Sequence, residues 1–250
     1  MKVFSIFTSI VAAVTMLVFT DIQQHERINR TTAAGLSNWE GRNWYAIGDS
    51  ITYANQYQRI VKLALGMKSV TTDAIPGQSI RTMADRVTKE TLKHIDLITV
   101  FGGTNDYGRN TPLGMPGDPP EAATFYGYVK KTIEKLNAAK PNKAKLVFIT
   151  PLKRGSFKNQ PIYPDANQVG ARLEDYVNAI EVVCVANKIP VIDLFHHSGL
   201  ELGNLSKYTK DHLHPNAAGY RKLSKVVVNR LKEVKPSAAM ESSSNVLQNR

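Results

Sequence analysis

The chain has 250 residues, of which 42% are hydrophobic and 21% are charged. This balance is ordinary for a folded protein and argues against a disordered chain or a multi-span membrane protein. The formal net charge is +11, but the basic residues are scattered and lack interleaved aromatic residues, which argues against a nucleic-acid-binding protein.

An apolar segment opens the chain. Lys2 is followed by an uncharged run from Val3 to Thr20. As a helix this run would measure about 27 Å, which approaches the thickness of a bilayer core. We therefore expect residues 1–20 to be a signal peptide or a membrane anchor, and the protein to be secreted or held at the outer face of the membrane. The polar residues 21–41 are expected to form a linker.

Five short β-rich segments alternate with helical patterns in the rest of the chain. The expected strands are Asn43 to Ile47, Ser69 to Ile75, Leu97 to Phe101, Lys145 to Thr150 and Pro190 to Phe195. This alternation indicates parallel strands joined by right-handed helical crossovers, and therefore a three-layer α/β/α sandwich. We expect this domain to span residues 42–235 and residues 236–250 to form a disordered tail.

The single cysteine, Cys184, excludes an internal disulfide. It lies on the apolar face of a predicted helix, so we expect a buried and inert thiol.

Three long loops follow predicted strands, at residues 106–120, 152–165 and 196–210. In an open parallel sheet, ligands bind outside the carboxyl ends of the strands. We therefore expect any functional site to lie among these loops.

Three short motifs end the first three predicted strands. Ser50 lies in "GDSIT", where a helix begins, and taken alone it would be interpreted as a helix cap. Gly77 lies in "IPGQS" and Asn105 in "GGTNDYG", and each taken alone is typical of a turn. The carboxylates of Asp49 and Asp106, beside these motifs, are expected to brace the loops by accepting backbone N–H bonds.

A fourth motif, "DHLHP", follows the last predicted strand. Asp211 precedes His214 by three residues, which in a tight loop would let its carboxylate hold the histidine tautomer that a general base needs. The alternative is a capped final helix beside an exposed histidine. A metal site built from Asp211 with His196, His197 or His212 has no fixed i, i+4 ligand pair, so no metal is expected.

Together, in this order, the four motifs resemble the signature blocks of the SGNH, or GDSL, hydrolases. The resemblance implies a flavodoxin-like fold of about five parallel strands and a serine esterase that needs no cofactor. Ser50 would attack an acyl carbonyl, His214 would take its proton and Asp211 would orient His214. The backbone N–H groups of Ser50 and Gly77, with the Asn105 side chain, would form the oxyanion hole. Two departures are Ile51 in place of the consensus Leu and the lack of an Asn before Gly77.

Basic residues on the flanking loops bear on the substrate. Arg109, Lys153 and Arg154 are expected to form a cationic rim, which suits a polar or anionic polymer. We expect O-acetyl or short-chain esters, with carbohydrate as the carrier. The alternatives are a lysophospholipase or short-chain lipid esterase, and a non-catalytic basic protein that binds an anionic cell-envelope surface.

Overall fold

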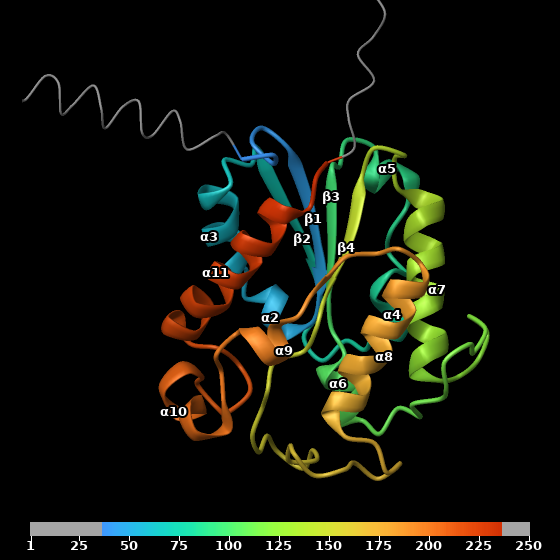
Figure 1. Ribbon diagram of the computed structural model, residues 1–250, viewed down its shortest axis with the longest axis vertical. Coiled ribbons are helices and arrows are strands. Elements are labelled where there is room, and N and C mark those ends of the chain that lie inside the picture. Colours follow the sequence, from blue (N-terminus) through green and yellow to red (C-terminus); the bar gives the residue numbers. More distant parts are fainter. Residues whose placement is uncertain (1–36, 237–250) are drawn as a thin grey trace, which may run out of the picture. The chain divides into compact units, whose positions relative to one another are not determined.

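A computed structural model describes residues 37–236, and Figure 1 shows their central sheet between two layers of helices. Its strands are β1 (Asn43–Gly48), β2 (Ser69–Ala74), β3 (Leu97–Phe101), β4 (Lys145–Ile149) and β5 (Val191–Ile192). Their order in the sheet is β2-β1-β3-β4-β5, and every pairing is parallel. The expected three-layer α/β/α fold is therefore confirmed.

The helices include four of nine or more residues: α3 (Gln56–Ala64), α7 (Phe125–Ala139), α8 (Leu173–Ala186) and α11 (Ala217–Glu233). The shorter ones are α2 (Ser50–Tyr53), α4 (Ile80–Met83), α5 (Lys89–Leu92), α6 (Thr104–Gly108), α9 (Leu194–His197), α10 (Leu205–Tyr208) and the 3-10 turn η1 (Leu202–Asn204). Figure 1 shows α3 and α11 over one face of the sheet, with α7 and α8 over the other.

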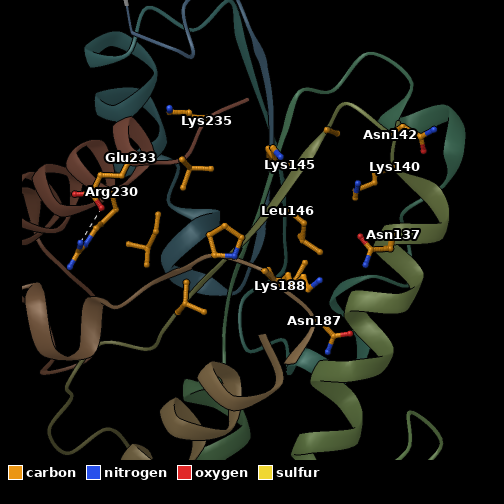
Figure 2. A pocket seen from close by; sticks show the side chains of 16 residues that line it. Asn137, Lys140, Asn142, Lys145, Leu146, Asn187, Lys188, Arg230, Glu233 and Lys235 are labelled. Atoms are coloured by element: carbon orange, nitrogen blue, oxygen red, sulfur yellow. Dashed lines mark hydrogen bonds and ion pairs between the residues drawn. The ribbon is translucent and has the colours of Figure 1, made fainter. Parts of the chain in front are cut away.

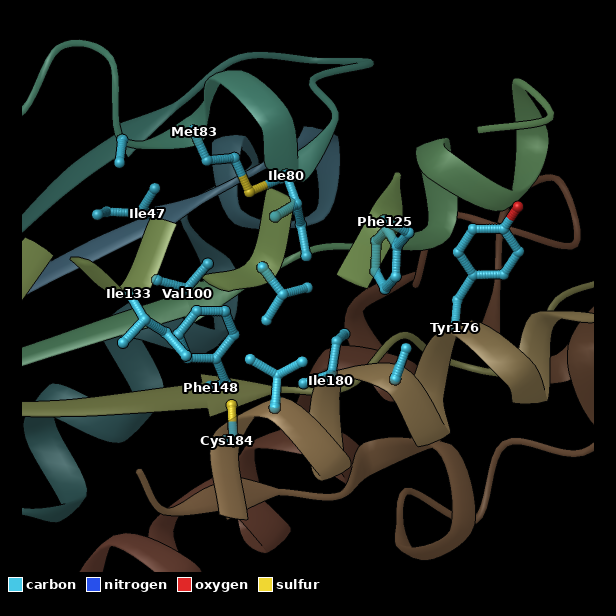
Figure 3. Packing of buried hydrophobic residues seen from close by; sticks show 14 of the residues in the cluster. Ile47, Ile80, Met83, Val100, Phe125, Ile133, Phe148, Tyr176, Ile180 and Cys184 are labelled. Carbon is cyan, nitrogen blue, oxygen red and sulfur yellow. The ribbon is translucent and has the colours of Figure 1, made fainter. Parts of the chain in front are cut away.

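Both faces of the sheet are buried because helices cover each of them (Figure 1), and successive side chains of a strand contribute to opposite faces. On β4, Phe148 belongs to one apolar cluster and Val147 to the other. Figure 3 shows Phe148 packed with Ile133 of α7 and with Ile180 and Cys184 of α8. The Cys184 thiol is buried, as expected, and burial raises its pKa.

The fifth strand is shorter than the sequence suggested. Pairing with β4 involves only Val191 and Ile192, and α9 begins at Leu194. The cause is Asp193, whose side chain accepts a hydrogen bond from His196 N–H and so caps a helix. The expected strand from Pro190 to Phe195 is therefore wrong in its second half.

The folded region extends to the N-terminal side of Arg42. Trp39 is fully buried, and its indole N–H donates to the Leu231 carbonyl at 2.7 Å. The expected linker at residues 21–41 thus overlaps the fold at its end.

The expected signal peptide or anchor at residues 1–20 lies outside the described residues, as does the tail beyond residue 236. Within residues 37–236, no helix is both long and apolar enough to cross a membrane.

Candidate active site

Ser50 lies where β1 gives way to the short helix α2. Asp49 is the N-cap of this helix, because its Oδ1 accepts a hydrogen bond from Ile51 N–H at 3.0 Å. Gly48 lets β1 pack closely against its neighbours here, since a Cβ at this position would lie 2.8 Å from the Phe101 carbonyl oxygen. The capping alternative for Ser50 is therefore wrong, and its hydroxyl is available to another partner.

That partner is His214. The Nε2 atom of His214 lies 2.9 Å from Ser50 Oγ, and its Nδ1 lies 2.7 Å from Asp211 Oδ2. The other Asp211 oxygen accepts backbone N–H bonds from His214 at 2.7 Å and from Leu213 at 3.2 Å. Burial alone would raise the pKa of Asp211, but the hydrogen bonds and charge of His214 outweigh it and lower that pKa below its ordinary value.

The loop that carries His214 is held on two sides. Lys210 N–H donates to the His214 carbonyl, and Gly155 N–H donates to the His212 carbonyl at 2.8 Å. Directly after the loop, the Asn216 side chain caps α11 by accepting from Ala218 and Gly219. These bonds fix the backbone on both sides of the imidazole.

The remaining histidines of this edge have other partners. The His212 backbone has φ +62°, and its N–H donates to Thr209 Oγ1. His196 Nδ1 lies 2.7 Å from Asp193 Oδ2, so this histidine pairs with Asp193 rather than with Asp211. No group of three metal-ligating side chains occurs within residues 37–236.

Gly77 lies in a tight turn after β2. Gln78 N–H donates to the Ile75 carbonyl at 3.1 Å, and Gly77 has φ +78°. With Pro76 before it, this is a type II turn, which favours glycine at its third position. Neither the Gly77 N–H nor that of Ser50, at the first helical position of α2, bonds any described residue.

Asn105 joins the first two motifs. Its side-chain amide donates to the Gln78 carbonyl at 3.1 Å and to Asp49 Oδ2 at 3.3 Å. The side chain is buried, and both amide hydrogens have an acceptor. A bond from Asn105 to a reacting oxyanion would therefore replace, or be shared with, one of these two.

Two buried carboxyl groups brace the same loops. Asp49 accepts from Ile51 N–H, and Asp106 accepts from Ile80 N–H at 3.1 Å, as expected of loop-bracing residues. Burial raises the pKa of each to about 7, and the nearby Asp106 charge further raises that of Asp49. One oxygen of Asp106, Oδ1, has no hydrogen-bond partner among the described residues.

The three predicted substrate-binding cations differ in exposure. Arg109 is exposed, and its Nη2 lies 3.0 Å from the position that a Cβ on Gly77 would occupy. Lys153 forms an ion pair with Glu201, with 2.7 Å between Nζ and Oε2. Arg154 is fully buried. The expected exposed rim is therefore wrong for Arg154, because the fold covers it, whereas substrate contact by the three residues stays a prediction.

Phe157 is a site residue that the sequence did not single out. Its ring meets the His214 imidazole edge to face, with 5.2 Å between centroids. The Arg154 guanidinium lies 6.0 Å from the Phe157 centroid and 5.9 Å from that of Tyr107. Arg154 Nη1 also lies 3.4 Å from Thr104 Oγ1, so this buried cation connects the loop after β4 to the Asn105 motif.

The family that comparisons with known proteins indicate agrees with this geometry. The family described as GDSL-like lipase/acylhydrolase matches residues 46–222. A search of curated proteins gave no match.

Many solved structures have a similar fold, including the following three. A protein from Lactobacillus plantarum is 27% identical, with a TM-score of 0.70, and the match covers 78% of this chain and 98% of that one. A possible lipase from Chitinophaga pinensis is 24% identical, with a TM-score of 0.66 and coverage of 77% and 98%. An acetyl-xylooligosaccharide esterase from Geobacillus is 15% identical, with a TM-score of 0.56 and coverage of 78% and 96%.

The family match spans most of the chain and includes the motifs of Ser50, Gly77, Asn105 and His214. The all-parallel five-stranded sheet agrees with the fold of the similar structures. The chain therefore belongs to the GDSL-like lipase/acylhydrolase family of ester hydrolases.

Proposed function

We propose that the protein is an exported serine esterase in which Ser50, His214 and Asp211 form the catalytic triad. The observation that carries this proposal is the unbroken hydrogen-bond chain from Ser50 Oγ through the imidazole to the Asp211 carboxylate. A neutral serine is a weak nucleophile unless an adjacent base removes its proton. His214 Nε2 is within reach of that proton, and ionised Asp211 stabilises the imidazolium that results.

The reaction takes two steps. Ser50 Oγ attacks the acyl carbonyl while its proton passes to His214 Nε2, and the tetrahedral intermediate collapses as the alcohol leaves with that proton. Water then gives a proton to His214 and attacks the acyl-enzyme, and the carboxylic acid leaves as Ser50 recovers its hydrogen. Each step forms an oxyanion, which needs donors already in place.

The Ser50 and Gly77 N–H groups supply two of these donors, since neither bonds a described residue. Asn105 supplies the third. Its amide already donates to Gln78 and Asp49, so we propose that the developing oxyanion shares one of these hydrogens in the transition state.

The ester that we propose carries a small acyl group, such as acetyl, on a carbohydrate. The exposed Arg109 guanidinium beside Gly77 supports a polar or anionic carrier. The similar fold of an acetyl-xylooligosaccharide esterase is compatible with this substrate but, at 15% identity, concerns the fold alone. Acetate and octanoate esters of the same alcohol separate this proposal from a lipid esterase, because a lipid esterase should prefer octanoate.

Export rests on the apolar run from Val3 to Thr20, which precedes the folded region. The measurement is intact mass on protein recovered separately from the native cytoplasm, membrane and medium. Protein found only in the cytoplasm with an uncut leader would contradict export.

A fluorophosphonate probe tests the nucleophile, because it labels a serine only when that serine is activated. We expect one label on the wild-type protein and none on Ser50→Ala. Ser156→Ala is the matched control, since Ser156 is exposed on the loop that carries Phe157. Labelling that survives in Ser50→Ala would remove Ser50 from the proposed role.

A further inference from the structure

A groove of about 740 Å³ lies at the end of the sheet opposite to Ser50. Its lining includes Lys145 and Leu146, at the start of β4, whereas Ser50 follows the carboxyl end of β1. Figure 2 shows side chains from the end of α7 on one side of the groove and from the end of α11 on the other. None of the predicted catalytic residues lines it.

The groove lies where β5 begins later along the sheet than β4, since Val191 pairs with Phe148 and β4 starts at Lys145. Only Phe148 and Ile149 of β4 pair with β5, and Phe148 N–H donates to the Pro190 carbonyl. Alternate residues of a strand direct their backbone polar groups to the same neighbour. Leu146 is in phase with Phe148, so its N–H and C=O face the side of β4 where β5 has not yet begun.

Positive charge dominates the lining of the groove. The five basic residues are Lys140, Lys145, Lys188, Arg230 and Lys235, and the one acidic residue is Glu233. Glu233 pairs with Arg230, with 3.1 Å between Oε2 and Nη1. No carboxylate within residues 37–236 pairs with any of the four lysines. The pKa of Lys140 is lowered, mainly by partial burial and to a smaller extent by the charge of Lys145.

Lysine at the edge of a sheet has a simpler explanation, because it discourages pairing with another strand. That explanation accounts for Lys145 but not for cations contributed by α11 and by the loop before β5. The amides of Asn137 and Asn142 also line the groove; both residues are exposed and bond no described residue, so their amides are open to a ligand. A hollow that combines unpaired ammonium groups with unpaired amides fits a ligand with both carboxylates and hydroxyls.

We propose that this groove is a non-catalytic attachment site for an acidic polysaccharide rich in uronate residues. Its carboxylates would pair with Lys140 and Lys145, and its hydroxyls would bond Asn137, Asn142 and the open backbone of Leu146.

Other anionic partners fit the groove less well. None of its described lining residues is aromatic, whereas single-stranded nucleic acid binds on aromatic platforms. None is a large, exposed hydrophobic residue of the kind that enters a lipid surface.

The test uses the full chain carrying Ser50→Ala, so that turnover cannot consume the probe. Binding of fluorescent polygalacturonate is followed by polarisation at about 0.05 M salt, where exposed charges are weakly screened. We expect Lys140→Glu with Lys145→Glu to weaken binding about tenfold or more, because four units of charge change within one groove. Lys140→Gln with Lys145→Gln should give a smaller loss in the same direction.

The matched control is Lys131→Glu with Lys225→Glu, on exposed positions of α7 and α11 outside the groove. The two double variants have the same net charge. An equal loss of binding in both would indicate a nonspecific attraction and overturn the proposal. Tighter binding of polyphosphate, duplex DNA or anionic vesicles than of polygalacturonate would overturn the choice of ligand. In a protein that keeps Ser50, Lys140→Glu with Lys145→Glu should hydrolyse a small neutral ester at the wild-type rate. This result would separate the groove from the proposed catalysis.

Discussion

Asp49 accepts a hydrogen bond from the Asn105 side-chain amide, with 3.3 Å between Asp49 Oδ2 and Asn105 Nδ2. The two residues are 56 positions apart in the chain. Asp49 adjoins Ser50 and Asn105 also bonds the carbonyl of Gln78, beside Gly77. One buried amide thus connects the turn that carries the proposed nucleophile to the turn that carries a proposed oxyanion donor.

Replacing Asn105 with alanine should lower kcat by about 10²- to 10³-fold, which is the usual effect of removing one oxyanion-hole donor. KM should change less, because the bond strengthens only as the oxyanion forms. Steady-state kinetics on a soluble acetate ester measure both constants. Unchanged kcat would remove Asn105 from the oxyanion hole.

Asp49→Asn should lower kcat by about 10- to 100-fold, because it would displace the Asn105 amide from the geometry that the reaction needs. The new side chain can keep one oxygen for Ile51 N–H, but its NH₂ then faces the NH₂ of Asn105. Asp49 would act as a positioning residue, through Asn105.

A double-mutant cycle tests this route. If Asp49 acts through Asn105, Asp49→Asn should cost little further kcat in a protein that already carries Asn105→Ala. Additive losses would mean that Asp49 acts by some other path. Asp85→Asn is the control for loss of a carboxylate, since Asp85 is an exposed partner of Lys135.

The sequence predicted the succession of strands along the chain and the motifs at the carboxyl edge of the sheet, because both depend on local patterns. Apolar runs of four to six residues identify buried strands, and turn residues directly after them mark the loops. It could not predict the bond between Asp49 and Asn105. Each side chain has a satisfactory local explanation, and only tertiary packing makes them partners.

Arg154 shows a second limit. An arginine in a polar loop is usually exposed, and the rings that cover it, Tyr107 and Phe157, lie 47 positions before it and three after it. By contrast, the early end of β5 had a local signal. Asp193 interrupts the apolar run from Pro190 to Phe195, and aspartate is a favoured N-cap residue, because its side chain accepts a backbone N–H bond from the first helical turn.

His214→Ala should lower kcat on the order of 10⁴-fold, because it removes the proposed base. His212→Ala should stay close to wild type, since the hydrogen bonds that His212 makes to described residues come from its backbone and not from its ring. The two histidines lie in one motif, so the pair controls for general damage to the loop. An inactive His212→Ala beside an active His214→Ala would reverse the choice of base.

Arg109→Ala should raise KM for an acetate ester that carries a carboxylate more than for its neutral counterpart. The reason is that the Arg109 guanidinium is exposed beside Gly77, where it can pair with an anionic carrier. The ratio of the two KM values is the measurement, and Arg59→Ala, on the exposed side of α3, is the control. An unchanged ratio would remove Arg109 from substrate recognition.

Asp106→Asn should make the protein less sensitive to rising pH. Burial raises the pKa of Asp106 from 3.8 to about 7, so the folded state binds a proton that the unfolded state releases between these values. Stability from this group is therefore complete below pH 3.8 and declines as pH rises through 7. Asparagine cannot ionise, so the variant should lose less Tm than the wild type between pH 5 and pH 8.5.

The difference in Tm between variant and wild type separates this effect from every other titrating group. Below pH 3.8 the carboxyl of Asp106 is protonated in both the folded and the unfolded state and resembles the amide in size and charge, so the two proteins should melt at similar temperatures there. At higher pH the wild type must bury a carboxylate with one oxygen that lacks a partner, whereas the variant has no carboxylate at this position. The removal of Asp106 also lowers the pKa of Asp49, which reduces the pH dependence further. A Tm difference that stays constant between pH 5 and pH 8.5 would show that Asp106 remains ionised in the folded protein at pH 5.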